Sequence, residues 1–129
     1  MSKLKCYYAH GMHTYGSTIE QEDIKLLEFL GFEVINPNTP EIQEDMRLYI
    51  SANGAGKTME YFTELVKSCD LLAFRGLPSL ILLSGVSVEI ETALDLGKPV
   101  IELPCSLQTR MLDYPTTKRY LIELGHYKV

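Results

Sequence analysis

The sequence lacks long apolar runs, an excess of basic residues and closely spaced cysteines. No stretch approaches the ~20 apolar residues of a membrane span, so we expect none. Acidic residues outnumber basic ones by 17 to 12, giving a net charge of −5, which argues against a nucleic-acid polymer as partner. Cys6, Cys69 and Cys105 form no C-x-x-C pair and are typical of reduced, mostly buried thiols in a cytoplasmic protein.

Metal-binding patterns are also missing. His10 and His13 lie close together, but no cluster of His, Cys and carboxylates has the spacing of metal ligands, so we expect neither a metal nor a cofactor. The N-terminus leads directly into a strand-like stretch, which is not typical of a signal peptide. With 129 residues, 46% of them hydrophobic, we expect a single domain over residues 1–129.

Short apolar segments alternate with helical ones along the chain. Ser17-Thr-Ile-Glu20 is a capping box that opens the first helix, and Gly31 marks its end. The alternation predicts an α/β domain of the three-layer flavodoxin-like or Rossmann-like type, with a parallel sheet of four to five strands. The predicted strands are residues 4–9, 32–35, 71–74 and 99–103, with an edge strand at 126–129; the predicted helices are 17–30, 41–50, 58–69, 87–96 and 116–124.

Ligands of parallel α/β sheets bind beyond the carboxyl ends of the strands. This rule selects the loops after Ala9, Asn36, Phe74 and Leu103. Several polar residues fall on these loops or near them, and they are candidates for substrate binding. They are His10, Asn36, Arg75, Ser84 and Ser87.

Glu89 is the strongest candidate for chemistry. We expect it in the first turn of a helix that follows the third strand, where the helix N-terminus stabilises an anion. An ionised glutamate there is suited to nucleophilic attack on an anomeric carbon, although acidic residues also occur in first turns for the dipole alone. Tyr7 and Tyr8 end the first strand, and only one of them can face the pocket, where its hydroxyl would orient Glu89. Ser84 and Ser87 provide either an anion site or an N-cap.

The segment Ser51–Thr58, SANGAGKT, resembles a phosphate-binding loop. It lacks the first glycine of that motif and follows the second predicted strand, whereas a true phosphate loop follows the first strand. We therefore interpret residues 51–56 as a flexible connection that closes over the pocket, and an ATPase as the weaker alternative. The apolar run Leu80–Leu83 on a loop indicates an oligomer contact or a pocket lid, and we expect a dimer.

Four segments, in this order, resemble the nucleoside 2-deoxyribosyltransferase-like family, which includes deoxyribosyltransferases and nucleoside 5′-monophosphate N-glycosidases. The most specific is GVSVEIETALDLGKPVIEL, residues 85–103, which carries a Gly-x-x-x-Glu-x-x-x-Ala-x-x-x-Gly-Lys-Pro pattern. The others are YYAHGM at 7–12, INPN at 35–38 and MEYFTELVKSCDLLAF at 59–74. The resemblance covers roughly residues 4 to 103.

The resemblance implies that Glu89 is the nucleophile that accepts the sugar and that Tyr7 contacts it. Ser84 to Ser87, Gly85 included, would bind the sugar or a 5′-phosphate, and Gly11 lies in the first matching segment. The implied substrate is a small-molecule nucleoside or nucleotide, and the implied assembly a homodimer or higher homo-oligomer.

Three positions depart from the family pattern. Leu83 stands where many members have Asp or Ser, Phe62 lies near the place of a transferase Asp, and His10 replaces a small residue. These departures leave open an alternative function, a non-catalytic module that binds or senses a nucleotide.

Overall fold

Four parallel strands form the centre of the fold, in the order β2-β1-β3-β4. This computed structural model describes residues 3–103 and 111–126. The arrangement is Rossmann-like or flavodoxin-like, as the alternation of segments predicted. The elements are β1 (Lys5–Ala9), a 3-10 turn η1 (Met12–Thr14), α1 (Thr18–Phe29), β2 (Glu33–Ile35), α2 (Pro40–Asn53), α3 (Thr58–Lys67), β3 (Leu71–Phe74), α4 (Ser84–Asp95), β4 (Val100–Glu102) and α6 (Tyr114–Glu123).

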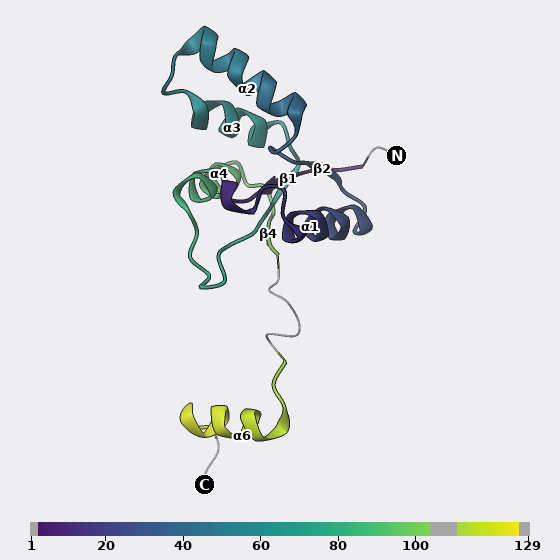
Figure 1. Cartoon of the computed structure of the whole chain (residues 1–129), viewed down its shortest axis with the longest axis vertical. Helices are drawn as coiled ribbons and strands as arrows, with labels where there is room; N and C mark the ends of the chain where they lie inside the picture. The colour runs from purple at the N-terminus through teal and green to yellow at the C-terminus, as the bar shows by residue number, and fades with distance from the viewer. Residues whose placement is uncertain (1–2, 104–110, 127–129) are drawn as a thin grey trace.

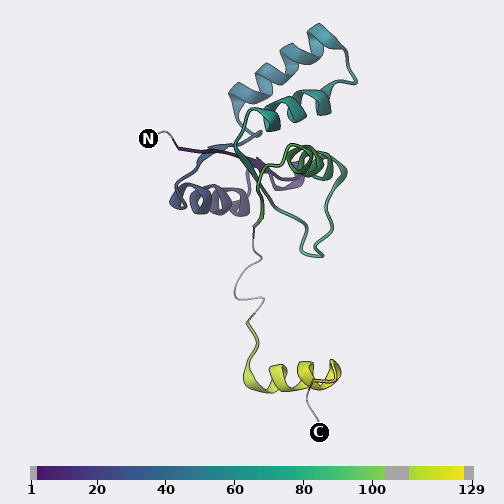
Figure 2. The same ribbon diagram turned by 180° about the vertical axis from the view of Figure 1, so that it is seen from behind.

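Helices cover both faces of the sheet (Figures 1 and 2). On one face, α3 and α4 contribute Val66, Val86 and Ala93 to a core that also includes Leu72 of β3. On the other face, Leu27 of α1 packs against a second core. α2 packs on α3, so the chain between β2 and β3 builds two helices on the same side.

β1 supplies the middle of both cores. Cys6, Tyr7, Tyr8 and Ala9 are completely buried, and successive side chains point to opposite faces. Tyr7 and Ala9 join the core under α3 and α4, whereas Cys6 and Tyr8 join the core under α1. The expectation that only one of the two tyrosines faces a given side is therefore confirmed.

Two predicted helix ends are confirmed. The Ser17 hydroxyl accepts a hydrogen bond from the Glu20 backbone N–H at 3.2 Å, which caps α1. Gly31 follows α1 with φ of +97°, a left-handed conformation that a residue with a Cβ would adopt only at a cost. The helix boundaries near the candidate site differ more from the predicted ones.

α4 begins at Ser84, three residues before the predicted start at Ser87, so the expectation that Glu89 lies in the first turn is wrong. Glu89 occupies the second turn, and the first turn holds no acidic residue. Ser84 and Gly85, which favour turns, are tolerated in the first turn because its N–H groups have no intrahelical partner there.

α2 is longer than predicted and includes residues 51–53, so the flexible connection is shorter than expected. Thr39 caps α2 by accepting from the Ile42 N–H, and the helix ends at Gly54, whose φ is +119°. Lys57, at the start of α3, pairs with Glu60 at 3.2 Å. The phosphate-loop-like segment is thus a helix end followed by a short turn.

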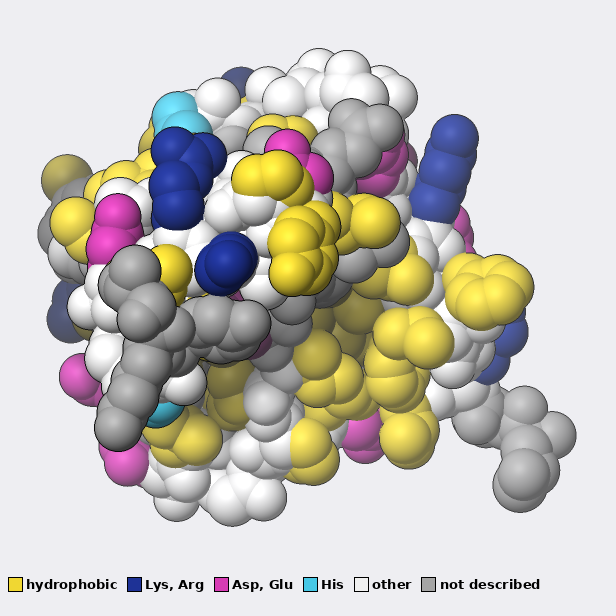
Figure 3. All heavy atoms as spheres, turned by 90° about the horizontal axis from the view of Figure 1, so that it is seen from below, with side chains coloured by type: hydrophobic (Ala, Val, Ile, Leu, Met, Phe, Trp, Pro, Cys, Tyr) yellow, Lys and Arg dark blue, Asp and Glu magenta, His cyan; other side chains and the backbone are white. Residues whose placement is uncertain are grey.

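Apolar side chains remain exposed on parts of the surface (Figure 3). Within the run Leu80–Leu83, Leu80 and Ile81 are 65% and 61% exposed, while Leu82 packs against the core under α3 and α4. No residue of α6 is buried, and Figures 1 and 2 both show α6 set apart from the layered body. The dimer expected from the run Leu80–Leu83 stays a prediction.

Some sequence-based expectations concern residues outside the described ones. These are the thiol of Cys105, the loop after Leu103 and residues 127–129 of the predicted edge strand, whose first residue, His126, lies in a bend after α6. The other two cysteines, Cys6 and Cys69, are buried free thiols, as expected. Among the helices that the structure describes, none has the length and apolar character needed to cross a membrane.

Candidate functional site

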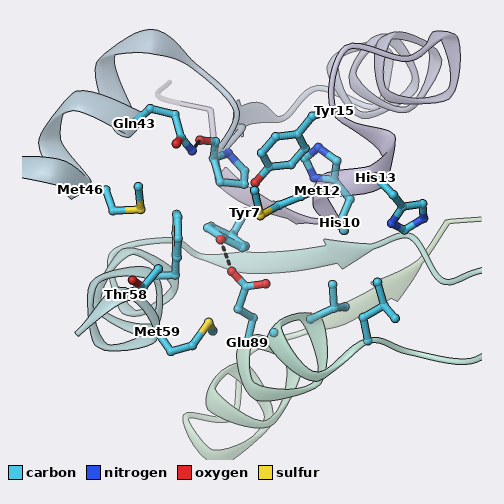
Figure 4. Close-up of a pocket in the computed structure, with 16 residues that line it drawn as sticks. Tyr7, His10, Met12, His13, Tyr15, Gln43, Met46, Thr58, Met59 and Glu89 are labelled. Carbon is cyan, nitrogen blue, oxygen red and sulfur yellow. Dashed lines mark hydrogen bonds between the residues drawn. The ribbon is translucent and has the colours of Figure 1, made fainter. Parts of the chain in front are cut away.

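A pocket of about 510 Å³ lies beyond the carboxyl end of β1, where the chain connections leave the sheet in opposite directions. Such a switch point is where open parallel sheets bind ligands. α2, α3, α4 and the segment after β1 surround it (Figure 4). The lining residues are Tyr7, His10, Gly11, Met12, His13, Tyr15, Pro37, Gln43, Met46, Thr58, Met59, Phe62, Leu83, Gly85, Val86 and Glu89.

Glu89 and Tyr7 meet at the floor of this pocket. The Tyr7 hydroxyl, from β1, donates a short hydrogen bond to Glu89 Oε2, from the second turn of α4. Only Oε2 is held in this way; the part of the chain that the structure describes offers no hydrogen bond to Oε1. Because no fully buried side-chain oxygen in that part lacks a partner, Oε1 must be accessible from the pocket. The pair predicted from sequence is therefore brought together, with one carboxylate oxygen open.

Burial raises the pKa of Glu89 to about 7, and the hydrogen bond from Tyr7 opposes that rise only in part. The Glu89 side chain lies among apolar residues, and the residue is only 7% exposed. The sequence-based expectation of a carboxylate held as an anion by the helix N-terminus is thus wrong. Glu89 lies one turn inside α4, so the helix N-terminus stabilises the carboxylate less than its removal from water costs.

This raised pKa predicts a pH-dependent cost in stability. Between pH 4.5 and 7 the unfolded chain has lost the Glu89 proton while the folded chain retains it, so stability falls as pH rises. Above pH 7 the full penalty, about 3 kcal/mol, applies. Glu89→Gln, which carries no charge, is expected to be more stable than the wild type at pH 8 by up to this amount, and equally stable near pH 4.5.

Urea unfolding of both proteins at several pH values between 4.5 and 8 measures this difference. Glu91→Gln provides the control because Glu91 lies on the same helix but is exposed. The prediction fails if the stabilities of Glu89→Gln and the wild type change in parallel with pH.

The rest of the pocket wall is largely apolar. Met12, Met46 and Met59 approach from three different elements, and flexible thioether side chains adapt to ligands of different shapes. Phe62 and Leu83, two of the departures noted in the sequence, both line the pocket. None of the described lining residues is Lys or Arg. The pocket thus presents one carboxylate in a mostly uncharged wall.

His10 lines the pocket, but both of its ring nitrogens are engaged within the protein. Nδ1 donates to the Tyr8 carbonyl oxygen at 3.0 Å, since a carbonyl can only accept. Nε2 lies 2.7 Å from Glu20 Oε2, with a proton between them. The ring stacks on Tyr8, with centroids 3.9 Å apart. The His10 side chain is fully buried as well, so it supports the pocket wall and offers a ligand no free ring nitrogen.

The other predicted substrate-binding residues divide into two groups. Gly11 and Gly85 line the pocket. A Cβ at Gly11 would come within 2.5 Å of the His13 ring, so glycine leaves room for that ring against the backbone of residue 11. Asn36, Arg75, Ser84 and Ser87 do not line the pocket.

The structure shows other roles for most of the second group. Asn36 accepts from the Asn38 backbone N–H at 2.9 Å, and the Ser87 hydroxyl donates to the Leu83 carbonyl at 3.0 Å. Arg75 lies near the core under α1, where it is paired with Asp23. Ser84 is exposed at the start of α4.

Sequence reasoning missed Tyr15 and Gln43. Tyr15 follows the turn η1, and its ring contacts His10 with centroids 4.9 Å apart. Gln43 Nε2 donates to the Pro37 carbonyl at 2.9 Å, which leaves its amide oxygen as an acceptor. Gln43 lies on α2, away from any strand end, whereas Tyr15 lies on the loop after β1 that the strand-end rule selected, although no local pattern distinguished it there. Both side chains line the same pocket, Gln43 from α2 and Tyr15 from the segment after β1 (Figure 4).

Across residues 3–103 and 111–126, no group of three or more His, Cys, Asp or Glu side chains is arranged to hold a metal ion. Comparison of the chain with protein-family models, with curated proteins and with solved structures found no match.

Proposed function

We propose that this protein cleaves the N-glycosidic bond of a nucleoside through Glu89. The observation that carries the proposal is the buried Tyr7–Glu89 pair, which leaves Oε1 open to an apolar pocket. A carboxylate placed in this way can attack a sugar carbon that develops positive charge as its bond to the base breaks. The motif resemblance supports the same assignment of Glu89.

The chemistry begins after Glu89 has lost its proton to solvent. Oε1 attacks C1′, and the bond from C1′ to the base nitrogen breaks, with its electron pair leaving on the base. The base takes a proton from water. Water, or a second base, then attacks C1′ and releases the sugar from Oε1, which regenerates the carboxylate. Two displacements at C1′ retain the configuration of the sugar.

Tyr7 orients the carboxylate in this proposal. Its hydroxyl donates to Oε2, which fixes the plane of the carboxylate and limits the rise in the pKa of Glu89. Burial raises the pKa of Tyr7 well above its usual value, so its proton stays in place. Tyr7 is therefore a hydrogen-bond donor throughout and does not act as a base.

The pocket wall favours a nucleoside without a phosphate. A 5′-phosphate carries a charge of about −1.5 to −2 near pH 7 and usually binds to Arg, Lys or a cluster of N–H groups. The described lining contains neither Arg nor Lys, so the first-turn N–H groups of α4 at Gly85 and Val86 would be the main donors to a phosphate, and Glu89 would repel it. We therefore expect base release from nucleosides to exceed release from their 5′-monophosphates by at least about 10-fold, which is 1.4 kcal/mol.

Chromatography of free base from matched nucleosides and 5′-monophosphates tests the proposed function. Wild-type protein and Glu91→Gln should release base at the same rate from the preferred nucleosides. Rapid release from monophosphates alone would contradict the substrate assignment. Tight nucleoside binding with no release would instead support the binding-module alternative, which the mostly apolar wall also accommodates.

A further inference from the structure

Tyr15 is a second phenol in the pocket, and the chemistry above does not use it. Figure 4 shows its hydroxyl directed into the pocket, on the side where Tyr7 meets Glu89. Within the described residues this hydroxyl makes no hydrogen bond, and the side chain is partly buried. Burial, with the charge of Glu89 as the next cause, raises the pKa of Tyr15 to about 12. The phenol is therefore a protonated donor near the carboxylate.

The segment that carries Tyr15 is held by a buried polar network. Glu20, which is 6% exposed, accepts from the Gly16 N–H at 3.1 Å and from the Asn38 side-chain amide at 3.1 Å. The Thr14 hydroxyl donates to the Gly11 carbonyl at 2.8 Å. These bonds fix the chain on both sides of Tyr15.

His10 supports the Tyr15 ring from behind. Its imidazole is fixed by Glu20 and the Tyr8 carbonyl, and it lies between the rings of Tyr8 and Tyr15. This arrangement restricts the direction of the Tyr15 hydroxyl before any ligand binds. A preorganised donor without a protein partner is suited to binding an oxygen of a ligand.

Stereochemistry identifies which oxygen this would be. In a β-nucleoside the base and the 5′ carbon lie on one face of the sugar ring, so Glu89 attacks C1′ from the opposite face. The 3′-hydroxyl, and the 2′-hydroxyl of a riboside, lie on that opposite face. A donor close to Glu89 therefore meets a sugar hydroxyl and not the base.

We propose that Tyr15 donates a hydrogen bond to a sugar hydroxyl on the face that Glu89 attacks, and so makes the pocket selective for the sugar. This proposal rests on the proposed nucleoside chemistry. It makes Tyr15 a substrate-binding residue that the sequence alone did not indicate.

The test combines Tyr15→Phe with substrates that lack single hydroxyls. Tyr15→Phe is expected to lower kcat/KM for adenosine or 2′-deoxyadenosine by about 10-fold, as for the loss of one hydrogen bond. On 2′,3′-dideoxyadenosine, which has no hydroxyl on that face, the same substitution should change kcat/KM by less than 2-fold. Tyr114→Phe, at a residue 77% exposed, is the matched control and should change neither value.

Calorimetry in the Glu89→Gln background provides a second measurement that needs no turnover. There, adding Tyr15→Phe should weaken adenosine binding by about 10-fold and leave dideoxyadenosine binding unchanged. An equal loss on all three nucleosides, or no loss on any of them, would overturn the role of Tyr15. If base release is independent of Glu89 but the Tyr15 pattern holds, the nucleophile is wrong and the sugar contact stands. A wild-type protein that neither binds nor cleaves these nucleosides would overturn both proposals.

Discussion

Glu89→Ala is expected to lower kcat/KM for base release by roughly 1,000-fold or more, because it removes the atom that bonds to C1′. Glu89→Gln should lose nearly as much, although its amide keeps the shape of the side chain and can still accept from Tyr7. The comparison separates the charge of the nucleophile from the packing of the pocket. Base release measured by chromatography over a series of substrate concentrations provides kcat/KM for each variant.

The pH profile provides an independent signature of the same group. Since only the ionised carboxylate attacks, kcat/KM should rise with pH and level off above about 7, the pKa of Glu89. Tyr7→Phe removes the hydrogen bond that lowers this pKa, so it should move the rise to higher pH. Glu91→Gln should retain the wild-type profile. Unchanged base release in Glu89→Ala would refute the assignment, whatever the profile of the other variants.

Activity and stability are opposed at Glu89. The burial that costs about 3 kcal/mol above pH 7 also keeps the carboxylate in an apolar wall, where water is scarce. A carboxylate that is poorly solvated is a better nucleophile than one surrounded by water. Glu89→Gln should therefore be the more stable protein at pH 8 and the inactive one, a combination that a purely structural glutamate would not produce.

The sequence predicted the parts of the site that depend on local patterns. The alternation of side chains along a strand separated Tyr7 from Tyr8, and the rule for strand ends indicated the loop after Ala9. The motif around Glu89 identified the acidic group. These inferences held because strand periodicity and chain order do not depend on how distant elements pack.

Distant packing explains what the sequence could not show. The start of α4 was placed too late because Ser84 and Gly85 favour turns, although a first helical turn tolerates them. Gln43 reaches the pocket from α2, an element that the strand-end rule does not consider, and nothing local distinguishes Tyr15 from its neighbours on the loop after Ala9. Arg75 follows β3 as the loop rule requires, but its guanidinium pairs with Asp23 from α1, a partner 52 residues away in sequence.

Asp23→Ala is expected to destabilise the protein by about 3 kcal/mol, because it removes one partner from a buried network. Asp23 is 3% exposed and accepts from the Tyr8 hydroxyl at 2.6 Å and from Arg75 Nε at 2.9 Å and Nη2 at 2.5 Å. The substitution removes the acceptor of the buried Tyr8 hydroxyl and the Asp23 carboxylate from the partly buried Arg75 guanidinium. Glu22→Ala, at an exposed position of the same helix, should cost less than about 0.5 kcal/mol.

Arg75→Met separates a structural role of this residue from a role in the site. Of the hydrogen bonds to the buried Asp23 carboxylate given above, this variant keeps the one from the Tyr8 hydroxyl. We therefore expect a loss of stability similar to that of Asp23→Ala. The double variant should lose clearly less stability than the sum of the two single losses, since both single variants break the same Arg75–Asp23 pair. Urea unfolding measures the three losses of stability, and strictly additive losses would contradict this prediction.

Because Arg75 does not line the pocket, folded Arg75→Met should keep the KM of the wild type for nucleosides. A large rise in KM would instead return Arg75 to the substrate-binding residues that the sequence predicted.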